Sequence, residues 1–199
     1  MKQQRRPDGP PGPLEQYQRG LAHARGLGVP LDFAEAARRF LAAAASGHAK
    51  SQYNLGVMHL TGLGARQDPD EAMRWFGLAA ERGEARAQFN LGIMHLNGHD
   101  GVRDPAKAAE WFNLAAQAGH GLAQHNLGLM YWRGLGLERD LARAHMWLSL
   151  AADGAECGQT GESAAARDEL AAMMTSDQMA EAKALATDFQ PRGGPTGDD

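Results

Sequence analysis

The hydrophobic and polar positions of the chain repeat with a period of 36 residues. The segment SQYNLGVMHLTG at 51–62 returns as AQFNLGIMHLNG at 87–98, and a looser copy, AQHNLGLMYWRG, follows at 123–134. Such self-similarity indicates stacked repeat units, because one copy cannot bury its own apolar face alone. Four columns keep the period through four copies: Gly20, Gly56, Gly92 and Gly128; Gly26, Gly62, Gly98 and Gly134; Asp32, Asp68, Asp104 and Asp140; Ala36, Ala72, Ala108 and Ala144.

Each copy has the pattern of two helices. In the first helix, which we expect near residues 50–60, Gln52, Leu55, Gly56 and His59 share one inward face. Glycine disfavours a helix. Its recurrence in mid-helix therefore predicts a point where two helices approach too closely for a side chain.

The second helix of each copy is predicted to begin at the aspartate column. Aspartate is a favoured N-cap and proline fits the first helical position, as in Asp68-Pro69. Glu71 follows Asp68 by three residues and Glu35 follows Asp32 in the same way, as in a capping box. We therefore interpret these aspartates as helix caps and not as repeated catalytic acids. The apolar face of the helix in the second copy comprises Ala72, Trp75, Phe76, Ala79 and Ala80.

Two further helices are predicted after the fourth copy. The first lies in residues 161–174, and Thr175 with Gln178 forms a capping box for the second. Their apolar stripes are Ala166, Leu170 and Met173, then Met179, Ala182, Ala186 and Phe189. Such a helix pair would cover the apolar face that the last repeat leaves open, as repeat arrays require.

The repeated unit resembles a known family. The stretch AQFNLGIMHLNG, continued by DPAKAAEWFNLAAQAGH, is similar to the Sel-one-like repeat (SLR), an α/α unit related to the tetratricopeptide repeats. The resemblance covers about three quarters of the chain and implies an all-α, right-handed α/α superhelical solenoid of four units. The predicted organisation is a disordered tail at 1–12, four repeats at 13–155, a helical C-terminal cap at 156–190 and a disordered tail at 191–199. Two departures from the family are the histidines that replace its usual tyrosine at the end of the first helix, and the lack of the cysteine pairs that some secreted bacterial members carry.

Composition narrows the class of protein. The formal net charge is -4, which does not indicate nucleic-acid binding. Cys157 is the one cysteine, so neither a disulfide framework nor a cysteine metal cluster is expected; an inert, part-buried thiol is a simpler interpretation than a nucleophile. The N-terminal segment has no apolar region of a signal peptide, and no run approaches the roughly 20 apolar residues of a membrane span. We expect a soluble, cytoplasmic protein without direct membrane insertion.

Positions that stacking does not need are the candidates for binding. On each first helix, one set of side chains lies roughly 120° around from the inward face, and the resemblance implies that these columns line a concave surface. The set comprises Tyr53, Val57 and Leu60; Phe89, Ile93 and Leu96; His125, Leu129 and Trp132; and, in the first copy, Tyr17, Leu21 and Ala24. For the column of Tyr53, Phe89 and His125, packing between repeats explains the pattern as well as partner contact does.

A column of asparagines runs beside this set, at Asn54, Asn90 and Asn126. An amide group has both donors and an acceptor, so it can pair with the backbone of a bound peptide. The alternative is that these asparagines only tie adjacent helices together.

The histidine column at His23, His59 and His95 also raises the question of a metal. Stacked copies would separate these residues by about one helix spacing, ~8–10 Å, whereas zinc needs three or four ligands at about 2 Å. His95 and His99 are four residues apart, but Gly98 is expected to end the helix between them. We therefore expect histidines that fill a packing position, and no metal or cofactor.

The sequence predicts a non-catalytic scaffold or adaptor that binds a protein or peptide on its concave face. The predicted contact residues are Tyr53, Asn54, Val57, Phe89, Asn90, Ile93, His125, Asn126 and Leu129. The alternative is a hydrolase of the kind proposed for the cysteine-rich relatives. An enzyme needs a unique constellation in one place, whereas here the notable residues recur in columns, so no catalytic residue is predicted. A third possibility, a regulatory surface for a membrane signalling complex, is not separable from the first by sequence.

Overall fold

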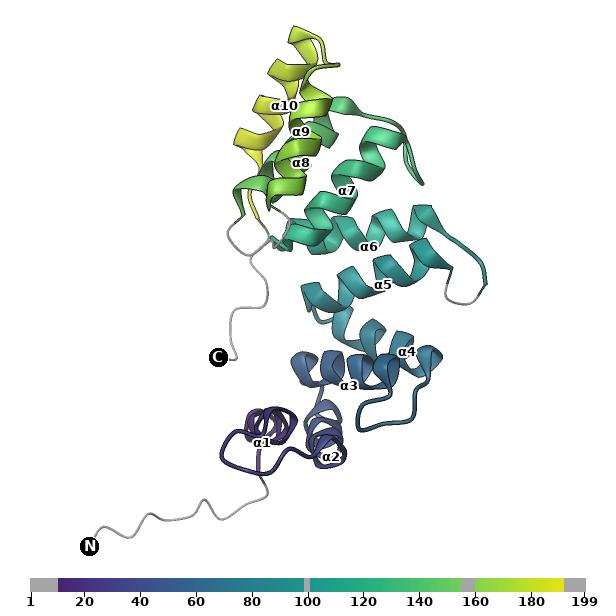
Figure 1. The fold of residues 1–199 in the computed structure, drawn as a ribbon, viewed down its shortest axis with the longest axis vertical. Helices are drawn as coiled ribbons and strands as arrows, with labels where there is room; N and C mark the ends of the chain where they lie inside the picture. Colours follow the sequence, from purple (N-terminus) through teal and green to yellow (C-terminus); the bar gives the residue numbers. More distant parts are fainter. Residues whose placement is uncertain (1–10, 99–100, 155–159, 192–199) are drawn as a thin grey trace, which may run out of the picture. The chain divides into compact units, whose positions relative to one another are not determined.

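The computed structural model describes residues 11–98, 101–154 and 160–191. These residues form ten α-helices, and none of them lies in a strand (Figure 1). The helices are α1 (Pro13–Arg25), α2 (Phe33–Ala44), α3 (Ala49–Thr61), α4 (Pro69–Ala80), α5 (Ala85–Asn97), α6 (Pro105–Gln117), α7 (Gly121–Arg133), α8 (Leu141–Asp153), α9 (Thr160–Ala171) and α10 (Ser176–Asp188). The predicted all-α fold, with two helices in each of four copies and further helices after them, is confirmed.

The described residues fall into two compact units, one ending at Ala72 and the other beginning at Met73. In the first unit, α2 packs against both α1 and α3. In the second unit, α6 packs against α5 and α7, and α8 packs against α7, α9 and α10. Within each unit, contacts therefore run mainly between helices that are neighbours along the chain, as in a repeat array.

The aspartate column caps the second helix of every copy, as predicted. Each side chain accepts a hydrogen bond from the backbone N–H three residues later: Asp32 from Glu35 at 2.9 Å, Asp68 from Glu71 at 3.0 Å, Asp104 from Lys107 at 2.9 Å and Asp140 from Arg143 at 2.8 Å. The capping box suggested at Asp32 was wrong. The Glu35 carboxylate binds Arg38 and Arg39 instead, which lowers the pKa of Glu35.

A backbone hydrogen bond closes the loop between the two helices of each copy. The N–H of the capping aspartate donates to a carbonyl near the end of the first helix. The pairs are Asp32 to His23 at 3.0 Å, Asp68 to His59 at 2.9 Å, Asp104 to His95 at 2.9 Å and Asp140 to Tyr131 at 3.1 Å. Since this bond already satisfies the aspartate N–H, Glu35 has no donor to reach back to.

The glycine column marks close helix approaches, as predicted. A Cβ built on Gly92 would lie 2.5 Å from Cε1 of Phe112, and one on Gly20 would lie 2.6 Å from Cε1 of Phe40. Phe112 and Phe40 belong to the second helix of the same copy and are almost fully buried. A larger residue at these glycines would therefore force the two helices apart.

A buried glutamine column links each copy to the one before it. Gln88 Nε2 donates to the carbonyl of Ala80 at 3.1 Å, and Gln124 Nε2 donates to that of Ala116 at 3.2 Å. The acceptors are carbonyls at the ends of helices α4 and α6, which also accept from the backbone N–H groups of Gly83 and Gly119 at 3.0 Å. The sequence pattern places Gln52 on the inward face, but this role of the glutamine column was not predicted.

The C-terminal helices both pack on α8. Leu170 of α9 is fully buried in a cluster with Leu148, and Phe189 meets Trp147 edge-on with ring centroids 5.2 Å apart. The predicted capping box of Thr175 is present. The prediction for Met173 was wrong: α9 ends at Ala171, and Met173 is 53% exposed.

Several predictions concern residues outside the described part of the chain. These are Cys157, His99 and most of the two predicted tails, at 1–10 and 192–199. Among the helices that the structure does describe, none combines the length and the apolar character needed to cross a membrane.

Candidate functional site

A pocket of about 250 Å³ in the first unit brings several predicted binding positions together. It is lined by Asn54 and Val57 of α3 and by Leu21 and Ala24 of α1. The other lining residues are Arg25, Phe33, Phe40, Met58, Thr61 and Leu63. The faces of α1 and α3 that the sequence predicted for binding therefore line one cavity in this unit.

The pocket is apolar with a few polar groups at its edge. Phe40 and Met58 are buried, whereas Leu63 is 50% exposed. The Asn54 amide and the Arg25 guanidinium form no hydrogen bond or ion pair with another described residue. The Thr61 hydroxyl donates to its own helix. The pocket therefore suits an apolar side chain of a bound partner. The Asn54 amide is placed to pair with the partner's backbone, and the Arg25 guanidinium with an acidic group of the partner.

In the first and third copies, the aromatic column packs between helices. Phe89 stacks on His120 with centroids 4.8 Å apart and also meets Phe112 at 5.7 Å. In the first copy, Tyr17 makes the corresponding contacts, with His48 at 4.7 Å and Phe40 at 6.0 Å. These contacts support the packing alternative for Phe89, which nevertheless stays half-buried.

Tyr53, the column member in the second copy, is also half-buried. In the third copy, the predicted contact residue Ile93 is half-buried too and packs against the apolar core of the second unit. Phe89 and Ile93 thus use part of their surface within the fold and leave the rest exposed.

His125 occupies the same column position but is covered by the C-terminal region. Its Nδ1 lies 2.9 Å from the hydroxyl of Ser163 on α9, and its side chain is buried. Burial lowers the pKa of His125; the charge of Glu162 opposes this effect, while that of Arg133 adds to it. The neighbouring Leu129 packs against the cluster that contains Leu170. The structure therefore covers His125 with α9 and places Leu129 against a cluster that α8 and α9 form together.

The asparagine column leaves its amides largely unused inside the protein. Asn126 Nδ2 donates to the carbonyl of Leu122 in its own helix at 2.8 Å. Asn54 and Asn90 are half-buried and form no hydrogen bond with another described residue. Among the described residues, the amides therefore do not tie adjacent helices together.

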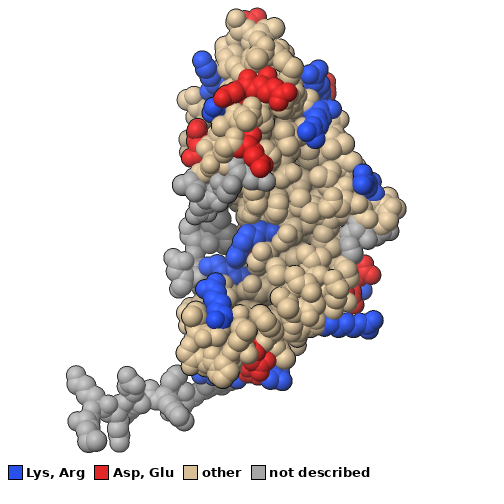
Figure 2. Space-filling model, viewed as in Figure 1, with Lys and Arg blue, Asp and Glu red and all other residues tan. Residues whose placement is uncertain are grey.

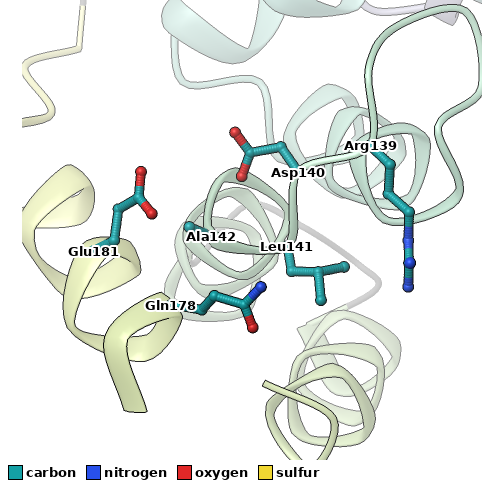
Figure 3. A pocket seen from close by; sticks show the side chains of 6 residues that line it. All are labelled: Arg139, Asp140, Leu141, Ala142, Gln178 and Glu181. Atoms are coloured by element: carbon teal, nitrogen blue, oxygen red, sulfur yellow. The ribbon is translucent and has the colours of Figure 1, made fainter. Parts of the chain in front are cut away.

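A second pocket, of about 320 Å³, lies where α8 and α10 begin (Figure 3). Figure 3 shows the carboxylates of Asp140 and Glu181 turned to the same side, with the Arg139 side chain directed away from them. Asp140 caps α8, and its carboxylate lies 3.4 Å from Arg143 Nε. The Gln178 side chain accepts a hydrogen bond from the Thr175 N–H in the capping box of α10. Asp140 and Gln178 therefore serve the helix ends, and we assign no chemical role to this pocket.

The described residues offer little catalytic machinery. No three His, Cys, Asp or Glu side chains among them lie close enough to hold a metal ion. The contact between His125 and Ser163 has the distance of a nucleophile and its base, but Ser163 is 0% exposed. A substrate could not reach the hydroxyl without movement of α9.

Paired helices with recurring caps, close-approach glycines and a fixed period define a helical-hairpin repeat protein. The family model for the Sel1 repeat matches residues 16–48, 49–84, 85–120 and 121–156. The chain therefore belongs to the Sel1 repeat family, as the resemblance predicted.

Among the solved structures with a similar fold are two repeat proteins. A protective antigen with an SLR fold from uropathogenic Escherichia coli is 31% identical over 92% of this chain, with a TM-score of 0.77; the match spans 38% of that protein. A Sel1 repeat protein from Oxalobacter formigenes is 27% identical over 86% of this chain, with a TM-score of 0.68; the match spans 73% of that protein. No curated protein matches the chain.

Proposed function

We propose that the chain is a non-catalytic scaffold or adaptor that binds a protein or peptide segment along the first-helix faces of its repeats. Repeats of this family generally mediate protein interactions. The observation that carries the proposal is the pocket lined by α1 and α3, in which the Asn54 amide and the Arg25 guanidinium have no partner among the described residues. An apolar cavity buries part of a ligand, and unpaired polar groups beside it fix the orientation of the ligand through hydrogen bonds.

The pocket suggests how a segment would bind. An apolar side chain of the partner would enter over Phe40 and Met58, and the Asn54 amide would pair with the partner backbone. Arg25 would meet an acidic group of the partner, since no carboxylate lines the pocket. In the second unit, Asn90 offers the same amide chemistry on the equivalent face of α5.

Site-specific photo-crosslinking would test this proposal. A benzophenone amino acid is placed at Leu63, which is 50% exposed and lines the pocket, or at Leu41, which is 52% exposed on α2 and does not line it. In lysate of the native cells, we expect a protein adduct from position 63 and a much weaker one from position 41. The opposite pattern would place the binding surface elsewhere.

Affinity measurements with the captured protein would then follow. Asn54→Ala should weaken binding about 2–10-fold, the value of one hydrogen bond, and Val57→Glu should weaken it more by placing a charge in the pocket. Leu41→Glu is the matched control and should bind as the unmodified chain does. Thermal melts of all variants separate a lost contact from a lost fold. Unchanged affinity in both pocket variants would contradict the proposal.

The hydrolase alternative has one feature in its favour, the 2.9 Å contact of His125 with Ser163. We interpret it as a structural contact because Ser163 is fully buried. Treatment with a fluorophosphonate probe, which labels activated serines, should leave the chain unmodified. Labelling that disappears in Ser163→Ala would establish a reactive serine and overturn the non-catalytic assignment.

A further inference from the structure

A groove of about 610 Å³ lies between α8, α9 and α10, in a part of the chain where the sequence predicted only a cap. It forms because α9 and α10 each pack on α8, while few contacts join α9 to α10 among the described residues. The lining residues are His145, Ser149 and Asp153 of α8, Arg167 of α9, and Met179, Ala182, Lys183, Ala186 and Thr187 of α10.

The groove combines an apolar floor with cations from two different helices. Ala182 is buried, and Met179 and Ala186 are half-buried beside it. Arg167 contributes from α9 and pairs with its neighbour Asp168 at 2.8 Å, while Lys183 contributes from α10 and forms no ion pair with a described residue.

Hydrogen-bonding groups complete the lining. The Ser149 hydroxyl lies 3.4 Å from His145 Nδ1, and the Thr187 hydroxyl donates to the Lys183 carbonyl at 2.9 Å. The Asp153 carboxylate is an acceptor for an N–H group. The groove therefore presents two cations, two hydroxyls, a histidine and one carboxylate around an apolar floor.

The two cations of the groove do not belong to a larger basic surface on the visible face. Figure 2 shows both signs of charge over the upper part of the visible face, where α8, α9 and α10 lie, so this end of the unit has no uniform basic surface there. Burial lowers the pKa of His145, and the charges of Arg167 and Lys183 add to that effect while Asp168 opposes it. Arg167 of α9 and Lys183 of α10 therefore both lower the pKa of the His145 imidazole, each from a different helix.

We propose that this groove binds the carboxyl terminus of a peptide. The terminal carboxylate lies between Arg167 and Lys183, and a small apolar side chain of the last residue rests on Ala182 and Ala186. This site is separate from the pocket of α1 and α3 and does not depend on the function proposed for it.

The charges favour a carboxylate over a phosphate. Two cations and one carboxylate line the groove, and the carboxylate of Asp168 beside it pairs with Arg167. With His145 neutral, these groups carry no net charge, so they accommodate a singly charged anion more readily than a phosphate. Arginine also binds carboxylates with two parallel hydrogen bonds. A chain terminus, unlike an aspartate or glutamate side chain, carries a backbone N–H next to its carboxylate, and Asp153 is the acceptor for it.

Nuclear magnetic resonance titration of the full ¹⁵N-labelled chain would test the proposal with three probes. These are acetyl-Gly-Ala-Ala with a free carboxylate, the same peptide with a C-terminal amide, and inorganic phosphate. We expect saturable shifts at the groove residues with the free acid, and binding of the amide weaker by about 10-fold or more, because a charge-assisted hydrogen bond is lost.

Two variants and one control locate the site. Arg167→Gln and Lys183→Gln should each weaken binding of the free acid by about 10-fold. The control is Arg143→Gln, an exposed arginine of α8 that pairs with Asp140 and does not line the groove. This control should bind the free acid as the unmodified chain does.

Proton linkage gives an independent readout. The carboxylate would lie near His145, whose charged neighbours are Arg167 and Asp168 from α9, Lys183 from α10 and Asp153 on its own helix. A nearby anion favours the imidazolium, so binding should raise the pKa of His145. Affinity should therefore be higher at about pH 5.5 than at about pH 7.5, and this difference should vanish in His145→Gln.

Three results would each overturn the proposal. They are equal affinity for the acid and the amide, unchanged affinity in both Arg167→Gln and Lys183→Gln, and binding of phosphate as tight as that of the peptide acid.

Discussion

Replacing Gly92 with alanine tests the close contact between α5 and α6. The new Cβ would lie 2.5 Å from Cε1 and 2.6 Å from Cδ1 of Phe112, far inside van der Waals contact. Phe112 is fully buried and Phe89 packs on its ring, so the ring cannot move without disturbing a second aromatic. Overpacking of this kind costs about 1–3 kcal/mol, while the better helix propensity of alanine returns up to about 1 kcal/mol. We expect a net loss of up to about 2 kcal/mol for Gly92→Ala, and a larger loss for Gly92→Leu.

Gly77 provides the matched control. It lies inside α4, and a Cβ built on it would meet no atom within 4 Å. Gly77→Ala should therefore gain the helix propensity without the clash and stabilise the chain by up to about 1 kcal/mol. The difference between the two alanine variants isolates the cost of the clash at Gly92.

Urea denaturation followed by circular dichroism would measure both variants. The slope of free energy against urea must stay constant for the comparison to hold, because a repeat array can unfold in parts. If Gly92→Ala were as stable as Gly77→Ala, the assigned contact with Phe112 would be wrong. A double-mutant cycle adds a check: in a Phe112→Leu background, which lacks the clashing ring atoms, the cost of Gly92→Ala should shrink.

Three further predictions concern the caps, the C-terminal helices and pH. Asp104→Ala should lower the free energy of unfolding by about 1 kcal/mol in urea melts. Asp104→Ser should lower it much less, because serine is also a favoured N-cap. Removal of residues 158–199 should expose Trp147 and Leu148, so that the fragment melts early or associates in light scattering; a monomer with the full-length melting temperature would contradict this. Because burial lowers the pKa of His125, the unfolded chain binds a proton more readily. Stability should therefore fall as pH drops below the ordinary histidine range, and less so in His125→Gln; equal pH profiles would contradict this.

The features that sequence predicted well depend on residues within a single copy. Asp68 caps α4 because the N–H groups of the first turn need an acceptor at that spacing, wherever the rest of the chain lies. Gly92 could be identified for a related reason, since a poor helix former that recurs in mid-helix needs a compensating packing role. The 36-residue period then extended these local observations to four repeats.

The features that sequence missed depend on contacts between distant residues. His125 shares a column with Phe89, yet Ser163 of α9 covers it. The repeat pattern does not indicate which side chains of the last copy the following helix contacts. Met173 matched the helical spacing, but α9 ends before it. The groove around Arg167 and Lys183 was missed for the same reason, because it forms only when α9 and α10 settle separately on α8.

The packing of α10 on α8 also bears on how such a chain could change in length. A further repeat joined after residue 156 would compete with α10 for the surface of α8. A duplicate of residues 85–120 placed before Gly121 would instead offer a copy of α6 to α7 and would carry its own capping aspartate and close-approach glycine. We therefore expect the array to grow, in evolution or by engineering, through internal duplication of repeats. The helices α9 and α10 would then keep their place on α8.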